Sequence, residues 1–132
     1  MYNQIVDTDV TNRLVIYHKD FIETNEPKSV SKYLAQKILE CSSQRRSMRM
    51  REIFDAMLDK LPEGVIIKDI DVMFNPEYQV DVLKILSGAR KHKRYRVIWP
   101  GRCEDGKLIY AEEGYLDYKV FEIKNYNIEC RI

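Results

Sequence analysis

The sequence predicts a three-layer α/β domain in which helices flank a mostly parallel sheet, with a short C-terminal antiparallel extension. β-branched and aromatic runs recur along the chain, at residues 13–17, 65–71 and 95–99. Between these runs lie segments whose apolar residues repeat at helical spacing. A strand, a helix and a second strand joined by a connection of this length form a parallel βαβ unit in nearly every known case.

Length and composition indicate one globular domain, residues 1–132, that folds without disulfide bonds or metal ions. The 22 basic and 21 acidic residues are too balanced for charge-driven disorder, and 5 Gly and 4 Pro are too few for a collagen-like chain. No apolar run approaches a membrane span, and the first residues do not resemble a secretory signal. We therefore expect a cytoplasmic protein without membrane contact.

The first expected elements are a strand at residues 13–17 and a helix that begins around Thr24–Pro27. Proline is well tolerated in a first helical turn, so we expect Lys28 and Ser29 to belong to that turn. The helix should end near Ser42, and its buried stripe comprises Val30, Tyr33, Leu34, Ile38 and Cys41.

The second expected helix has the clearest periodicity, and Pro62-Glu63-Gly64 ends it. Its apolar residues repeat at i, i+3, i+4, i+7 and i+8 and are Met50, Ile53, Phe54, Met57, Leu58 and Leu61. The run at residues 65–71 then predicts a strand covered on both faces.

A third helix is expected from the cap-like pair Asn75-Pro76 to the basic end at Arg90-Lys91. The strand at residues 95–99 follows, and Trp99 stands at its carboxyl end, where α/β sheets usually bind ligands. Two further strands, at 108–111 and 118–123, predict the antiparallel extension.

Few residues of the chain suit catalysis or metal binding. Cys41, Cys103 and Cys130 are widely separated, and with His18 and His92 they form no metal-ligand pattern. We therefore expect free thiols in a reducing cytosol, no metal site and no catalytic residue.

Asp69 and Asp71 at the end of the 65–71 strand have the arrangement of a Walker B element, whose Asp holds Mg²⁺ beside a nucleotide. Turn or capping roles also explain an Asp at a strand end. The nearest match to a phosphate loop is 22–29, where Lys28 and Ser29 fit but the glycines are absent. If ATP and Mg²⁺ bind at all, Lys28, Ser29, Asp69 and Asp71 are the candidate residues.

Two local clusters of basic residues indicate a possible contact with nucleic acid, although solvated helix ends or docking faces for an acidic partner explain them too. The basic middle and the acidic C-terminal third of the chain could equally pair two copies of it. The candidate residues are Arg45, Arg46, Arg49, Arg90, Lys91, Lys93 and Arg94.

Five segments in order resemble BrxF, a small P-loop-type protein of BREX (bacteriophage exclusion) gene clusters in bacteria. The likeness runs from about Ser29 to Tyr118. The segments are 34–40 (LAQKILE), 66–76 (IIKDIDVMFNP), 83–87 (LKILS), 97–101 (VIWPG) and 106–114 (GKLIYAEEG), the last followed by Asp117-Tyr118.

The resemblance implies a P-loop NTPase-like fold that works beside larger ATPase and other subunits in defence against phage. It aligns Asp69 with the magnesium-binding acid, whereas the family's Gly-rich phosphate loop is degenerate or missing here. The leading hypothesis is therefore a non-catalytic accessory subunit that acts by docking and carries no cofactor. The alternatives are a divergent ATP-binding ATPase, a nucleic-acid-binding module, and a mimic that inhibits the defence complex.

Overall fold

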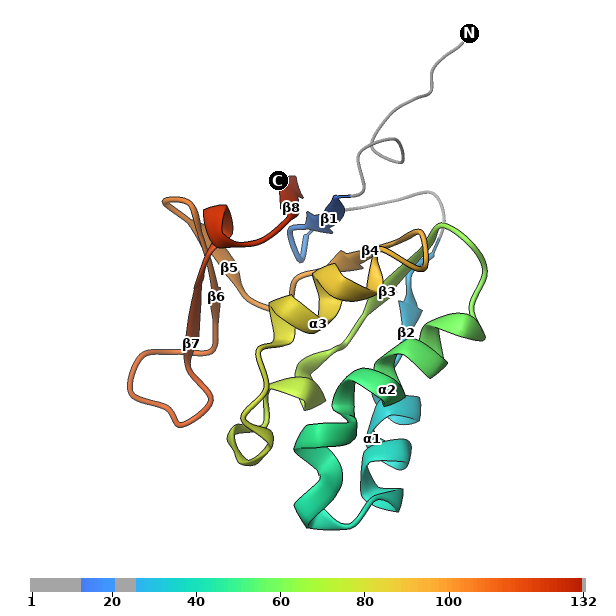
Figure 1. Ribbon diagram of the computed structural model, residues 1–132. Coiled ribbons are helices and arrows are strands. Elements are labelled where there is room, and N and C mark those ends of the chain that lie inside the picture. The colour runs from blue at the N-terminus through green and yellow to red at the C-terminus, as the bar shows by residue number, and fades with distance from the viewer. Residues whose placement is uncertain (1–12, 21–25, 132) are drawn as a thin grey trace, which may run out of the picture.

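The computed structural model describes residues 13–20 and 26–131, which form an α/β arrangement of a parallel sheet, a smaller antiparallel sheet and flanking helices (Figure 1). The parallel sheet has the strand order β2-β3-β4-β1-β8, and every neighbouring pair is parallel. Its strands are β1 (Leu14–Tyr17), β2 (Lys28–Ser29), β3 (Val65–Lys68), β4 (Tyr95–Ile98) and β8 (Ile128–Arg131). The expected strands at 13–17, 65–71 and 95–99 are confirmed, with slightly shorter bounds.

The two faces of the parallel sheet bury separate sets of side chains, because successive strand residues point to opposite sides. Leu14, Ile16 and Val97 belong to the main core, together with every buried apolar residue of the helices α1, α2 and α3. On the other face Val15, Tyr17, Ile66 and Ile98 form a small cluster made of strand residues alone. The described residues therefore build two layers of the three that were predicted.

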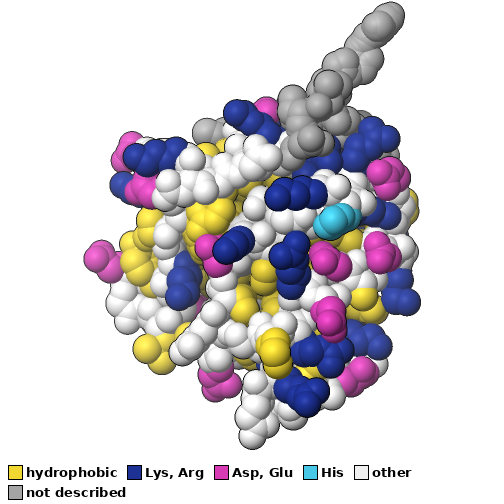
Figure 2. All heavy atoms as spheres, viewed as in Figure 1, with side chains coloured by type: hydrophobic (Ala, Val, Ile, Leu, Met, Phe, Trp, Pro, Cys, Tyr) yellow, Lys and Arg dark blue, Asp and Glu magenta, His cyan; other side chains and the backbone are white. Residues whose placement is uncertain are grey.

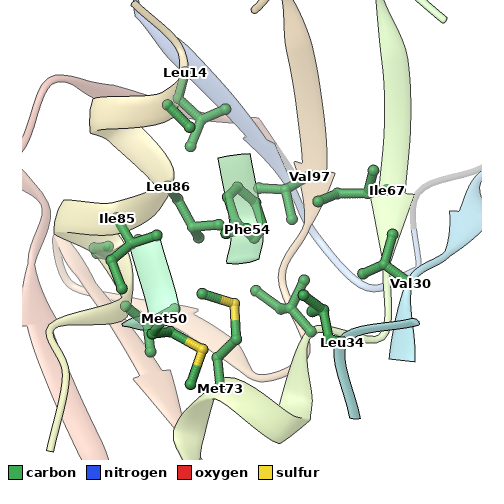
Figure 3. Close-up of a cluster of buried hydrophobic side chains, with 14 of the residues drawn as sticks. Leu14, Val30, Leu34, Met50, Phe54, Ile67, Met73, Ile85, Leu86 and Val97 are labelled. Carbon is green, nitrogen blue, oxygen red and sulfur yellow. The ribbon is translucent and has the colours of Figure 1, made fainter. Parts of the chain in front are cut away.

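Helices α1 (Ser31–Glu40) and α2 (Arg46–Asp59) carry the apolar stripes that the sequence predicts. Leu34 and Ile38 of α1 are fully buried, as are Met50 and Phe54 of α2. Figure 3 shows the Phe54 ring in the middle of this core, among side chains that come from the helices and from the strands. The core thus fixes the helices against one face of the sheet.

The start of the first helix differs from the prediction. Lys28 and Ser29 lie in edge strand β2, opposite Ile67 and Lys68 of β3, and the helix begins only at Ser31. The Val30 amide continues this pairing by donating to the Lys68 carbonyl over 3.1 Å. Pairing with β3 satisfies backbone groups that a first helical turn would leave without partners, so tertiary context overrides the proline signal.

The third helix also begins later than predicted. Instead of one helix from Pro76, the chain forms short 3₁₀ turns η3 (Asp71–Phe74) and η4 (Pro76–Tyr78) before α3 (Val82–Ala89). Gln79 has φ 51°, a left-handed conformation that ends η4. The Asp81 side chain then accepts from the Lys84 amide and caps α3.

The antiparallel sheet is an insertion between β4 and β8, which corrects the expected C-terminal position. It has the order β5-β6-β7, and its strands are β5 (Arg102–Glu104), β6 (Lys107–Tyr110) and β7 (Lys119–Glu122). The expected strands at 108–111 and 118–123 correspond to β6 and β7. The prediction missed β8, a short strand that pairs with β1 and returns the chain to the parallel sheet.

Trp99 joins the two sheets. Its indole is 1% exposed, and its Nε1 donates to the Ile109 carbonyl of β6 over 3.0 Å. Phe74 and Phe121 meet its ring edge-on, with centroids 5.5 and 5.8 Å away. Buried aromatic contacts and a satisfied indole donor therefore fix the antiparallel sheet against the end of β4.

Within residues 13–20 and 26–131, no helix is both long enough and apolar enough to cross a lipid bilayer.

Candidate functional site

A cavity of about 410 Å³ opens at the carboxyl ends of the parallel strands. Ligands bind at this edge in open α/β sheets, and the volume falls within the usual range for small-molecule sites. Its lining comes from segments after β1, before β2, after β3 and at the end of β4. The lining residues are Lys19, Glu26, Pro27, Lys68, Asp69, Ile98, Trp99 and Pro100.

Asp69 is the one of the four predicted nucleotide-site residues that lines this cavity. It follows β3 directly, is exposed, and has φ 65°, in the left-handed region. Asp tolerates this conformation better than most residues, so the turn places a carboxylate at the cavity without needing glycine. Asp69 therefore occupies the position that a magnesium-binding acid would take at a strand end.

Asp71 has a different role. It opens η3, and its Oδ2 accepts a hydrogen bond of 3.1 Å from the Tyr110 hydroxyl of β6. Burial raises the pKa of Tyr110 above its ordinary value, and the Asp71 charge and hydrogen bond raise it further. Tyr110 also stacks on Phe74, with ring centroids 3.9 Å apart. Asp71 thus holds the antiparallel sheet in place and does not line the cavity with Asp69.

Lys28 and Ser29 are exposed on β2 and are not among the residues that line the cavity. The hydroxyls of Ser29 and Ser31 lie 3.4 Å apart, so Ser29 contacts the start of α1. The cations at the cavity are instead Lys19 and Lys68. Sequence reasoning missed both, although each stands at or just after the end of a strand in the parallel sheet, which is the available signal.

The charged residues that line the cavity are of both signs. Lys19 and Lys68 line the cavity together with Glu26 and Asp69, so two basic and two acidic residues surround it. Ammonium groups bind phosphate oxygens, and carboxylates are suited to Mg²⁺ held jointly with a phosphate ligand. The arrangement is chemically able to hold a small phosphate-bearing molecule with a divalent cation.

The first basic cluster comprises Arg45, Arg46 and Arg49, and two of these residues contact other groups of the fold. The Arg46 Nε donates to the carbonyls of Ile38 and Cys41, at 3.1 and 3.2 Å, and so satisfies carbonyl groups at the end of α1. The Arg49 Nε lies 2.8 Å from the Glu52 carboxylate. Arg45 is exposed beside them.

The second basic cluster comprises Arg90, Lys91, Lys93 and Arg94, which follow α3, and Lys93 contacts the chain just after α2. Arg90 is 5% exposed, and the Lys93 ammonium donates to the Leu61 carbonyl. Arg94 lies 3.4 Å from Glu63, while Lys91 is exposed. Members of both clusters thus make contacts within the fold, and Figure 2 shows basic and acidic side chains interspersed on one face.

The antiparallel sheet presents apolar side chains to solvent. Leu116 is 90% exposed and Tyr115 68% exposed in the loop between β6 and β7, and Val120 is 42% exposed on edge strand β7. We call these three residues the insert surface. Figure 2 shows hydrophobic side chains reaching the surface on this side of the molecule. Large contiguous apolar patches on a protein surface mark interaction sites.

Comparison of the chain with models of known protein families, with curated proteins and with solved structures found no match. Two features of the described residues bear on function: the charged cavity at the carboxyl edge of the parallel sheet, and the insert surface.

Proposed function

We propose that this protein is a non-catalytic P-loop-like accessory subunit of a bacterial antiphage defence complex, and that it acts by docking to a larger ATPase or another subunit. The observation that carries the proposal is the position of Lys28 and Ser29. Both residues lie in edge strand β2 and not at the amino terminus of a helix. The resemblance to BrxF supplies the class of partner.

The fold implied by that resemblance needs a phosphate loop that leads from the first strand into a helix, whose free amides face the phosphates. Among the described residues, the element that follows β1 is β2, and α1 begins after β2, at Ser31. The strand position of Lys28 and Ser29 supports a scaffold that does not use them as phosphate-loop residues. What supports the scaffold is the parallel sheet and the Asp69 position at the end of β3.

The insert surface is the docking face that this proposal assigns. Val120 lies on strand β7, whose Phe121 packs against Trp99, and Tyr115 and Leu116 lie in the loop that leads into that strand. A partner would therefore meet a surface that is anchored at one end. Arg102 pairs with Glu104 and Glu112 at 3.1 and 2.8 Å, within the same sheet and the loop beside it. A preformed apolar patch with charged neighbours is typical of a protein interface.

A binding experiment tests the docking role. The proposed partner is the large ATPase subunit of such a defence complex, and its affinity is measured for the wild type, Leu116→Glu and Met48→Glu. Met48 is the matched control, because it is also 73% exposed but lies on α2. We expect at least a tenfold loss for Leu116→Glu and none for Met48→Glu. Equal binding by both variants, each folded by circular dichroism, would contradict docking through the insert surface.

The cavity supports a second candidate, a divergent ATP-binding protein that uses Asp69 with Lys19 and Lys68 in place of a phosphate loop. Calorimetry with ATP and Mg²⁺ separates the two candidates. The docking proposal expects no heat at millimolar nucleotide. Micromolar binding that is lost in Asp69→Ala and Lys19→Ala but retained in Lys28→Ala would instead establish nucleotide binding at this cavity.

A further inference from the structure

Cys103 and Cys130 are 27 positions apart in the sequence, yet the fold brings their side chains into hydrogen-bond contact. Cys103 belongs to β5 of the antiparallel sheet, and Cys130 belongs to β8 at the edge of the parallel sheet. Both side chains line one small cavity between the two sheets, together with Trp99. The sequence analysis treated these cysteines as unrelated free thiols.

Each of the two cysteines is held in place by strand pairing in a different sheet. Cys130 lies opposite Ile16 of β1 in the parallel sheet, and Cys103 lies opposite Leu108 of β6 in the antiparallel sheet. Both residues are half-buried. A disulfide forms readily only where the backbone already holds two cysteines close together, and pairing on both sides provides that here.

Cys41 is the internal comparison. It also is a partly exposed free thiol, but it follows α1 and lines a separate groove between α1 and α2. If exposure alone governed disulfide formation, all three cysteines would react to the same extent. If the fold governs it, only Cys103 and Cys130 form a disulfide with each other.

The surroundings of Cys103 and Cys130 indicate which of the two reacts first. Burial raises the pKa of Cys130 to about 12, and the charge of Cys103 and its hydrogen bond add to that rise. Cys130 is therefore held as a neutral thiol, and we assign the first attack to Cys103. Once Cys103 has reacted, its charge no longer opposes deprotonation of Cys130, so the second step becomes easier.

We propose that Cys103 and Cys130 form a reversible intramolecular disulfide that ties the antiparallel sheet to the edge of the parallel sheet. The oxidant is a small-molecule disulfide such as oxidised glutathione. The Cys103 thiolate attacks one of its sulfur atoms, forms a mixed disulfide and releases one glutathione thiolate. Cys130 then loses its proton to solvent and attacks the Cys103 Sγ, which releases the second thiolate. Two protein thiols lose two electrons, and one glutathione disulfide gains them.

The disulfide does not depend on the proposed function, but both involve the antiparallel sheet. The same antiparallel sheet carries the insert surface, and Figure 1 shows β5 and β8 as neighbouring parts of the molecule. A disulfide here would lock the mutual position of the two sheets. Trp99, the single tryptophan, lines the shared cavity, so its fluorescence reports the bond because disulfides quench nearby indoles.

The test equilibrates the full-length folded protein in buffers of reduced and oxidised glutathione, followed by alkylation and peptide mass spectrometry. We expect the alkylated thiols to fall from three to one, with Cys41 modified and Cys103 linked to Cys130. Quenching of Trp99 should follow the same midpoint. Cys41→Ser is the matched control and should give the same linked peptide with no remaining thiol.

Three results would overturn the proposal. They are three alkylated thiols under oxidising conditions, a stable glutathione adduct on Cys103 or Cys130, and a linkage that involves Cys41. Repeating the equilibration in concentrated urea shows whether the fold selects the pair. The proposal requires that the Cys103–Cys130 link predominate in the folded protein and lose that preference in urea.

Discussion

Replacing Gly101 with alanine should break the joint between the two sheets. A Cβ added at this position would lie 2.0 Å from the Ile109 carbonyl oxygen and 3.0 Å from the Trp99 Nε1. Those two atoms are the acceptor and the donor of the buried hydrogen bond that joins β6 to the end of β4. The closest atom belongs to the backbone, so a side-chain rotation cannot relieve the contact.

Two effects set the size of the fall in the free energy of unfolding for Gly101→Ala. Separating the indole N–H from its acceptor in a buried site costs about 1–3 kcal/mol. Moving a paired strand to admit a methyl group costs about 1–3 kcal/mol more, as overpacking does elsewhere. The free energy of unfolding should therefore fall by about 2–6 kcal/mol, a large part of the 5–15 kcal/mol of a typical domain.

Urea unfolding followed by Trp99 fluorescence measures this loss, because the indole is 1% exposed in the folded protein and becomes solvated on unfolding. The matched control is Gly88→Ala in α3, where the new methyl group meets only Arg51 atoms at 3.5 Å or more. Alanine is the better helix former, so this variant should be about 0.5–1 kcal/mol more stable than the wild type.

An unfolding midpoint for Gly101→Ala equal to that of the wild type would refute the reasoning. It would mean that β6 does not approach Gly101 as closely as described, or that the Trp99 hydrogen bond contributes nothing. Equal destabilisation by Gly88→Ala and Gly101→Ala would also refute it, because a general cost of added methyl groups would then explain both.

Three further predictions concern other parts of the fold. Arg46→Met should lower the free energy of unfolding by about 1–3 kcal/mol in urea titrations, because the Cys41 carbonyl loses the Arg46 donor and the Ile38 carbonyl keeps only the Cys41 amide; an unchanged midpoint would contradict this. Phe54→Ala should cost about 3–5 kcal/mol by the same measurement, since the ring is fully buried, whereas a loss below 1 kcal/mol would show a core able to collapse around the gap. Burial, the hydrogen bond to Asp81 and that carboxylate's charge raise the pKa of Tyr126 from 10.0 to about 12. The stability from this shift is complete below pH 10.0 and is lost as the pH rises toward 12, so Tyr126→Phe should flatten the decline in unfolding free energy over that interval, and an identical decline would contradict it.

Local patterns identified much of the fold. The apolar runs at β1, β3 and β4 and the stripes of α1 and α2 are properties of short segments, so periodicity alone located them. Strand β8 escaped notice because four residues with a half-buried pattern resemble a loop until β1 is placed beside them. The late start of α3 escaped notice because Asn75 caps a 3₁₀ turn as well as it would cap a helix.

The candidate site was predicted in part. Asp69 could be found from the sequence, since an acid at the end of a buried strand is a local signal. Lys19 and Lys68 could not be assigned to the cavity in the same way, because the strand order that brings them together is a non-local property. Lys28 and Ser29 were misplaced for the same reason, since only pairing with β3 makes them a strand.

The sequence by itself determined the α/β class, the parallel strands in the main sheet and the helical stripes, because hydrophobic spacing acts over a few residues and directly sets which face is buried. Only the tertiary structure decided that residues 28–29 form an edge strand, that Asp69 and Asp71 serve different sites, and that Cys103 meets Cys130. Each of these depends on segments distant in the chain, whose mutual placement is set by strand pairing and by packing of the shared core.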